Sequence, residues 1–296
     1  MWHPEPGWQR LTAGTGSSTV GVWRAGDRVV KRLGAPLPGD PEMLSDPRHA
    51  AYWRRPAEVA TSGVVEETPG LRSPAALGVE EDDEGITVWL PQVPEQPPTG
   101  LFVARCLGEF TAAELGKARW LARGQLRDRM RMLERRGGWP TLARTTVADV
   151  ADHLWRRREI HLEAVDALPV VPQHGDPTPA NLHAHDERGV LALDWATLGT
   201  GPVGGDLGYW SLSTREGFEP LVEAYTAALP TGLASPEQVL LGARVTAVYT
   251  ALSRAEWALA RVATGPGALA GKFKHPSVAP YLLALQRQFP QLEALL

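Results

Sequence analysis

Four prolines in residues 91–100, PQVPEQPPTG, divide this chain into two parts of different character. Proline fixes one backbone angle and has no amide hydrogen, so such a run continues neither a helix nor a strand. Short alternating, β-branched segments precede the run, and segments with helical apolar spacing follow it. The run therefore predicts a linker between a small strand-rich lobe, residues 1–93, and a larger helical lobe, residues 94–296.

The first part predicts two pairs of strands and one helix. STVGVW (residues 18–23) and DRVVKRL (residues 27–33) alternate on either side of a Gly-Asp turn, and two shorter strands flank the acidic turn EEDDEG. The segment 47–63 has a helical pattern that ends at Gly63, and Pro56 inside it should kink or split the helix.

The second part is predicted to be mainly helical, with one short strand insert. The helical segments are residues 101–124, 145–168, 218–230, 235–263 and 280–289, and the strand is GVLALDW at 189–195. Strands gathered at one end and helices at the other are typical of an α+β fold, and they exclude a doubly wound sheet.

Composition excludes several classes of protein. The net charge is -4 over 296 residues, whereas a nucleic-acid-binding surface calls for a basic excess. The single cysteine, Cys106, allows no disulfide and no cysteine zinc site within one chain. The N-terminal residues MWHPEPGWQR have no apolar core of a signal peptide, and no run of eighteen apolar residues exists. We therefore expect a soluble, cytoplasmic protein with no membrane partner.

The N-terminal lobe holds a glycine-rich loop, AGTGSSTVGVW, and a lysine in the next strand. Val20 to Trp23 continue as a strand, so neither a dinucleotide fold nor a P-loop is indicated. The loop is either an ordinary turn or a flap whose amides and hydroxyls face phosphate oxygens. Lys31 is either a solvated strand residue or, as in kinase-type lobes, a phosphate-binding lysine.

The stretch QHGDPTPANLHAHDERGVLALDW, from residue 173, holds most of the candidate chemistry. His183, His185 and Asp186 are candidate metal ligands, but a strand also places two such histidines on one face without any metal. We find neither the Gly-x-Ser-x-Gly elbow of serine hydrolases nor the further acidic and histidine clusters of a two-metal phosphoesterase.

Phosphoryl transfer is the chemistry that uses the spacing of this stretch. Asp176 can act as the base for an acceptor hydroxyl. Asn181, five residues later, offers a neutral amide oxygen, and Asp194 at the end of a strand offers a charged one. Oxygen ligands of this kind suit magnesium on nucleotide phosphates.

At these residues the chain resembles a known family. HGDPTPAN resembles the His-Gly-Asp-x-x-x-x-Asn catalytic loop of the aminoglycoside phosphotransferase and choline-kinase-like superfamily. LALDWATLGTGPVGGDLG resembles the segment after that loop, with Asp-Trp where protein kinases have Asp-Phe-Gly. The resemblance implies a bilobal protein-kinase-like fold, with a small antiparallel N-terminal lobe and a helical C-terminal lobe.

The resemblance also implies roles for named residues. Asp176 would be the catalytic base, Asn181 and Asp194 the magnesium ligands, and Lys31, held by Glu58, the phosphate ligand. His174 and Asp206 would support the loop. The nucleotide would be held by the flap and by a hinge in VWLPQV, that is, by Gly14, Gly16, Ser17, Ser18, Trp89 and Leu90. Pro56 places the pairing of Lys31 with Glu58 in question.

The expected function is transfer of the γ-phosphate of ATP or GTP, with Mg²⁺, to a hydroxyl of an aminoglycoside, amino alcohol or sugar. Ammonium groups would need acids, and choline would need an aromatic cage. The candidates are Glu216, Glu219, Glu223, Glu256, Trp155, Tyr209, Trp210, Tyr249 and Trp257. A solvated helix face explains the acids better, and core packing explains the aromatics at least as well. A nucleotide-binding protein without transferase activity is the alternative, and the oligomeric state is left open.

Overall fold

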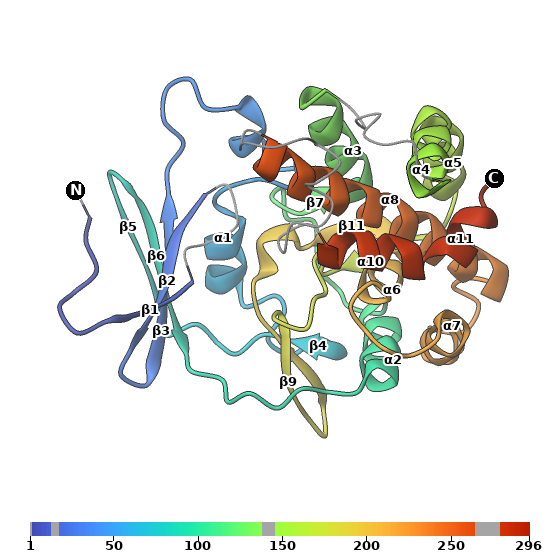
Figure 1. Ribbon diagram of the computed structural model, residues 1–296. Helices are drawn as coiled ribbons and strands as arrows, with labels where there is room; N and C mark the ends of the chain where they lie inside the picture. The colour runs from blue at the N-terminus through green and yellow to red at the C-terminus, as the bar shows by residue number, and fades with distance from the viewer. Residues whose placement is uncertain (1, 13–17, 138–145, 264–278) are drawn as a thin grey trace.

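The computed structural model describes residues 2–12, 18–137, 146–263 and 279–296 and has two lobes, a sheet with one helix beside it and a larger helical part (Figure 1). This arrangement confirms the α+β, protein-kinase-like fold. Within the described ranges no helix is long and apolar enough to cross a membrane.

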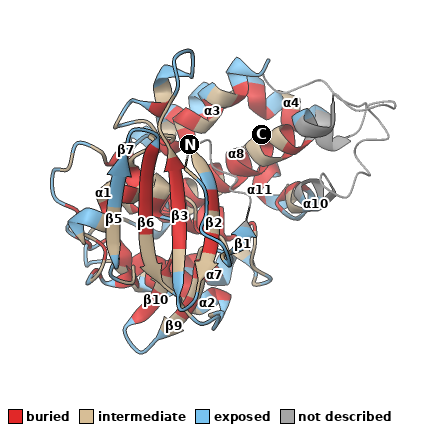
Figure 2. Cartoon of the chain, turned by 90° about the vertical axis from the view of Figure 1, so that its left-hand side faces the viewer, coloured by how far each residue is buried: buried red, intermediate tan, exposed pale blue. Residues whose placement is uncertain are grey.

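The N-terminal lobe is an antiparallel sheet of five strands in the order β1-β2-β3-β6-β5. The strands are β1 (Gln9–Thr12), β2 (Thr19–Ala25), β3 (Arg28–Gly34), β5 (Gly78–Asp82) and β6 (Gly85–Pro91). Figure 2 shows that β3 and β6, at the middle of the sheet, are buried over much of their length. Both predicted strand pairs are confirmed, because β2 pairs with β3 and β5 with β6.

Helix α1 (Arg55–Ser62) packs against this sheet through Ala57, which joins Leu33, Ile86 and Val88 in a small core. The predicted helix over 47–63 is too long, because residues before Arg55 form turns. Pro56 therefore lies in the first turn, where a missing amide hydrogen breaks no intrahelical bond, and the predicted kink is wrong. Gly63 ends the helix with a φ of 63°, as expected.

The C-terminal lobe is mainly helical, as predicted. Its helices are α2 (Gly100–Phe110), α3 (Gln125–Arg135), α4 (Thr146–Arg156), α5 (Arg158–Asp166), α6 (Gly205–Trp210), α7 (Phe218–Ala227), α8 (Pro236–Ala263), α10 (Ala279–Arg287) and α11 (Phe289–Glu293). Short 3₁₀ helices are η1 (Glu42–Leu44) and η2 (Trp195–Thr197). The predicted helix over 101–124 ends early, since turns with Gly116 at a φ of 68° follow Phe110.

Helix α8 is the centre of this lobe, and it packs against α3, α5, α6, α7, α10 and α11. Its approach to α6 is close, because a Cβ on Gly208 would lie 2.1 Å from the carbonyl oxygen of Ala243. Only glycine permits such an approach of two backbones. The result fixes α6, and with it Asp206, against the central helix.

Two three-stranded sheets lie where the lobes meet. One has the order β4-β10-β9 and the other the order β7-β11-β8. Their strands are β4 (Gly70–Arg72), β7 (Ala122–Arg123), β8 (Val170–Gln173), β9 (Leu182–Asp186), β10 (Gly189–Ala192) and β11 (Gly199–Pro202). Strand β4 precedes the proline run yet pairs in parallel with β10. The run itself, residues 92–99, has no helix or strand, and a domain boundary at residue 93 stays a prediction.

Candidate active site

The loop between β8 and β9 carries Asp176, and the carboxylate of Asp206 in α6 binds the backbone of this loop. The two carboxylate oxygens of Asp206 accept from the amides of His174 at 2.6 Å and Gly175 at 3.0 Å. Burial raises the pKa of Asp206, although His174 and the two amides act in the opposite direction. Gly175 has a φ of 83°, and a Cβ there would lie 2.7 Å from the carbonyl oxygen of Thr197. These bonds and this close contact therefore fix the conformation of the backbone directly before Asp176.

His174 joins this loop to the segment after β10. Its ring is fully buried, and its Nδ1 accepts from the amide of Asp176 at 3.2 Å. Nε2 therefore carries the proton, which it donates to the carbonyl of Leu193 at 2.9 Å. The ring also lies 4.6 Å from that of Trp195. These contacts fit the supporting role expected of His174.

Asn181 lies directly against Asp176. Its amide nitrogen donates to the backbone carbonyl of Asp176 at 2.9 Å and to Oδ2 at 3.0 Å. The amide oxygen takes no part in these two bonds. Asn181 thus orients the carboxylate of Asp176 through its amide nitrogen, and the amide oxygen is left free of these two bonds.

Asp194 follows β10 in a left-handed conformation, with φ 55° and ψ 64°. Among the described residues it is the one non-glycine with a positive φ. Such strain concentrates at functional sites. Its carboxylate pairs with Lys31, Nζ to Oδ1 at 2.6 Å. Burial acts to raise the pKa of Asp194, but the charge and hydrogen bond of Lys31 outweigh it and the pKa is lowered, so the carboxylate is ionised.

The predicted pairing of Lys31 with Glu58 is not the one in the structure. Glu58 lies beside Arg54 one helical turn earlier, with Oε1 3.7 Å from Nε. That neighbour at i−4 is local to the helix start, whereas the buried Lys31 has a closer partner in Asp194. Glu58 is therefore placed on α1 as expected, with a different partner.

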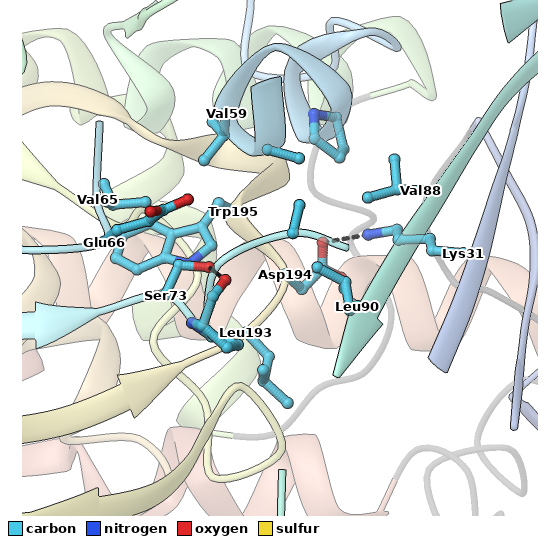
Figure 3. Close-up of a pocket in the computed structure, with 14 residues that line it drawn as sticks. Lys31, Val59, Val65, Glu66, Ser73, Val88, Leu90, Leu193, Asp194 and Trp195 are labelled. Carbon is cyan, nitrogen blue, oxygen red and sulfur yellow. Dashed lines mark hydrogen bonds and ion pairs between the residues drawn. The ribbon is translucent and has the colours of Figure 1, made fainter. Parts of the chain in front are cut away.

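Two neighbouring cavities lie between the lobes. Asp194 borders both of them, and Lys31 borders one. The Lys31 cavity, of about 520 Å³, is lined by residues that include Lys31, Val59, Val88, Leu90, Leu193, Asp194 and Trp195 (Figure 3). The Asp176 cavity, of about 720 Å³, is lined by residues that include Ser18, Thr19, Tyr52, Asp176, Asp194 and Thr197. Figure 3 shows the ammonium of Lys31 directed at the carboxylate of Asp194.

The residues expected to hold the nucleotide are only partly placed in these cavities. Ser18 borders the Asp176 cavity and Leu90 the Lys31 cavity. Gly14, Gly16 and Ser17 lie outside the described residues.

The expected hinge is largely engaged within its own lobe. The ring of Trp89 packs 5.5 Å from that of Trp8, and the indole does not border the Lys31 cavity. The carbonyl of Trp89 accepts from the amide of Leu77 at 2.8 Å, and the amide of Gln92 donates to the carbonyl of Asp27 at 3.1 Å. These two backbone groups are therefore engaged within the lobe, and a purine contact elsewhere in VWLPQV stays a prediction.

The histidine pair of β9 forms no metal cluster. His185 Nδ1 lies 2.9 Å from the carbonyl of Gln96, and Asp186 pairs with Arg72. Across the ranges that the structure describes, no group of three or more His, Cys, Asp or Glu side chains is placed to hold a metal.

Arg55, a fully buried arginine at the start of α1, is not evident as a key residue from the sequence. Its guanidinium donates to five backbone carbonyls, those of Pro47, His49, Ala50, Trp120 and Ala196. Burial lowers the pKa of Arg55 to about 10, so it stays charged at neutral pH. An arginine inside an expected helix carries no local signal for this role.

A cluster at Asp176 is likewise not evident from the sequence. Tyr209 of α6 donates its phenol to Asp176 Oδ1. Arg254 of α8 donates to the oxygen of Tyr209 at 2.8 Å and lies 4.0 Å from Asp176 Oδ1. Arg129 of α3 donates to the carbonyl of Gly175. The one feature of the sequence that could have indicated this cluster is the position of Tyr209, three residues after the expected support residue Asp206.

Solved structures with the same fold include several phosphotransferases. A choline/ethanolamine kinase family protein from Mesorhizobium loti is 18% identical, with 94% of this chain and 92% of that chain covered and a TM-score of 0.59. A thermostable mutant of the aminoglycoside phosphotransferase APH(4)-Ia is 14% identical, with 97% and 94% covered and a TM-score of 0.58. The aminoglycoside phosphotransferase APH(3'')-Id from Streptomyces rimosus, in complex with ADP and streptomycin, is 19% identical, with 82% and 94% covered and a TM-score of 0.51.

Comparison with curated proteins gives no match. The family model described as "Phosphotransferase enzyme family" matches residues 8–238, which is most of the chain and includes the loop of Asp176, the strand end at Asp194 and the start of α8. On this evidence the chain belongs to the phosphotransferase enzyme family.

Proposed function

We propose that this protein transfers the γ-phosphate of ATP or GTP to a hydroxyl of a small molecule. The observation that carries the proposal is that Asp176 and Asp194, from separate turns, border one cavity, which Ser18 and Thr19 of the other lobe also line. Lys31 reaches Asp194 from the opposite lobe. A carboxylate for the acceptor's proton, a second carboxylate for the metal and a lysine for the phosphates are the groups that phosphoryl transfer uses. Nucleotide-bound neighbours such as APH(3'')-Id support the same chemistry.

In this proposal Asp176 receives or orients the proton of the acceptor hydroxyl. Its carboxylate is held by Asn181 on Oδ2 and by Tyr209 on Oδ1, so it cannot rotate freely. A base fixed in this way keeps its geometry while the hydroxyl approaches the phosphorus, and general-base catalysis of this kind contributes about 10²–10⁴-fold.

Asp194 and Asn181 are the residues that would hold Mg²⁺. Both offer oxygen, the ligand atom that magnesium prefers, and Asp194 is ionised. Bound magnesium would neutralise charge on the phosphates as the γ-phosphoryl group leaves. Lys31, now paired with Asp194, would turn to the phosphate oxygens when the nucleotide is present.

The test is nucleotide hydrolysis in the presence and absence of magnesium, with Asp176→Asn and a matched control. Asp27→Asn makes the same change on a carboxylate that is 97% exposed, in the turn before β3. We expect magnesium-dependent hydrolysis by the wild type and by Asp27→Asn, and a loss of about a hundredfold or more in Asp176→Asn.

Equal hydrolysis by Asp176→Asn and the wild type would contradict the role of Asp176. Saturable nucleotide binding by the wild type with no hydrolysis or transfer would favour a nucleotide-binding protein without transferase activity.

A further inference from the structure

Tyr209, Arg129 and Arg254 surround Asp176 and indicate which class of acceptor it would serve. This inference rests on the proposed phosphoryl transfer. Arg254 Cζ lies 4.3 Å from the centre of the Tyr209 ring, and Arg129 Cζ lies 4.6 Å from it. In the described ranges Asp176 is the one carboxylate recorded within ion-pair distance of Arg254, and Arg129 has none. Both guanidinium groups lie over the Tyr209 ring, and Arg254 also faces the carboxylate of Asp176, so positive charge gathers at this side of Asp176.

Two of the acidic residues considered as ligands for ammonium groups already have partners within the protein. Glu256 is 3% exposed and pairs with Arg136, with Nε 2.9 Å from Oε2. Glu216 accepts from the amide of Gly100 at 2.8 Å and from the hydroxyl of Thr214. These two carboxylates have their hydrogen-bond partners already, so they offer little to a cationic acceptor.

Three of the aromatic residues considered for a cation cage are engaged within the fold as well. The phenol of Tyr249 bonds the carbonyl of Leu154 at 2.9 Å, and Trp210 donates to the carbonyl of Gly100 at 3.2 Å. Tyr209 is the aromatic residue at Asp176, but the arginines already lie over its ring. A quaternary ammonium needs an open aromatic face, which Tyr209 does not present.

We propose that the acceptor is an anionic hydroxylated molecule, with a carboxylate or phosphate group that binds Arg254 while its hydroxyl lies at Asp176. Arg254 is 25% exposed and Asp176 is 36% exposed, so both side chains reach solvent. A guanidinium has five donors, and the described contacts of Arg254 use one of them, on Tyr209. The remaining donors match the paired oxygens of a carboxylate or phosphate.

Geometry limits the size of this acceptor. Because Arg254 Nη2 lies 4.0 Å from Asp176 Oδ1, one small molecule can contact both. With ordinary hydrogen-bond lengths at each end, its hydroxyl and anionic oxygens are at most about 10 Å apart. A hydroxy acid or a sugar phosphate meets this limit.

The experiment compares hexoses that share a ring and differ in charge. Transfer from MgATP is measured for glucuronate, glucose 6-phosphate, glucose and glucosamine, with the wild type, Arg254→Met and Arg156→Met. Arg156 is a surface arginine, 73% exposed and paired with Asp152 within α4, so its variant controls for loss of one positive charge. Thermal shift with MgADP reports the nucleotide site and folding of each protein separately.

We expect the wild type and Arg156→Met to use one of the two anionic sugars with a kcat/KM at least tenfold above glucose and glucosamine. Whichever anion is used identifies carboxylate or phosphate as the source of the charge. Arg254→Met should lose this preference mainly through a higher KM, which a purely structural role of Arg254 would not produce.

Several outcomes overturn the inference. They are preference for glucose or glucosamine, absence of transfer to either anion, and an anionic preference that persists in Arg254→Met. If the wild type binds MgADP and hydrolyses ATP while showing one of these results, the proposed function stands and the anionic acceptor fails. If it neither binds MgADP nor hydrolyses ATP, the proposed function fails as well.

Discussion

Single side chains decide how Asp176 is held. Tyr209 is buried, and that burial, together with the charge of Asp176, raises the pKa of its phenol. The phenol therefore stays protonated and donates to the carboxylate throughout the neutral range. Arg254 in turn donates to the phenol oxygen, so one side chain aligns the base and connects it to α8.

Tyr209→Phe should lower kcat without weakening MgATP binding, since it removes a hydrogen bond to a charged group and leaves the packing of the ring. A bond of this kind contributes about 1.5–3 kcal/mol, so we expect a fall in kcat of about tenfold to a hundredfold. Steady-state kinetics measure it. Tyr249→Phe removes another buried phenol bond, to the carbonyl of Leu154, and should leave kcat unchanged. An unchanged kcat in Tyr209→Phe would remove it as a positioning residue.

At the scale of elements, the β5–β6 hairpin is closed by an ion pair to β3. Arg32 donates to both oxygens of Asp82, at 2.9 Å and 2.6 Å. These bonds, with the amides of Glu84 and Gly85, lower the pKa of Asp82 from 3.8 to about 2. A carboxyl whose pKa is lower in the folded state stabilises the fold above its unfolded pKa and loses that contribution as pH falls through the folded value.

The wild type should therefore lose stability between about pH 4 and pH 2 by an amount that Asp82→Asn does not lose. Urea unfolding at several pH values from neutral down to the folded pKa measures the difference between the two proteins, which should shrink as pH falls. Asp83→Asn, on the exposed neighbour in the same turn, should follow the wild type. A gap between wild type and Asp82→Asn that stays constant with pH would contradict the assignment.

At the scale of the whole molecule, Arg55 fastens α1 to the rest of the chain. Its carbonyl partners belong to the loop before α1, the segment before β7 and the turn after Asp194. Because every hydrogen bond that Arg55 donates goes to a neutral backbone carbonyl, its removal leaves several buried acceptors without a donor. The same contacts bring η2, and hence Asp194, next to α1.

Arg55→Met should reduce the free energy of unfolding by about 3 kcal/mol or more, because buried carbonyls would lose their donor. Arg54→Met is the matched control, since Arg54 pairs with Glu58 and Glu81 at the surface and should cost at most about 1 kcal/mol. Urea unfolding of both variants measures the contrast. Equal losses would mean that Arg55 does not hold the lobes together.

The elements that sequence patterns predicted well are those whose signal is local. The hairpins formed where alternating apolar residues flank Gly26 and the acidic turn, and α8 formed over its predicted segment. The predicted helix over 47–63 was too long, because residues 47–54 form turns around the buried Arg55. The apolar pattern of the sequence does not indicate that packing. The bond from the amide of Leu77 to the carbonyl of Trp89, within the expected hinge, was likewise outside the reach of the local pattern.

The sequence by itself determined the set of candidate groups at the centre of this protein, because Asp176 and Asn181 are five residues apart on one loop and contact each other locally. It also determined the order of strand-rich and helical parts. Only the tertiary structure decided the partner of each charge. Lys31 meets Asp194 across 163 residues, and Tyr209, Arg129 and Arg254 converge from three helices. Such contacts depend on how distant elements pack, and the periodicity of apolar residues along the chain does not predict that packing.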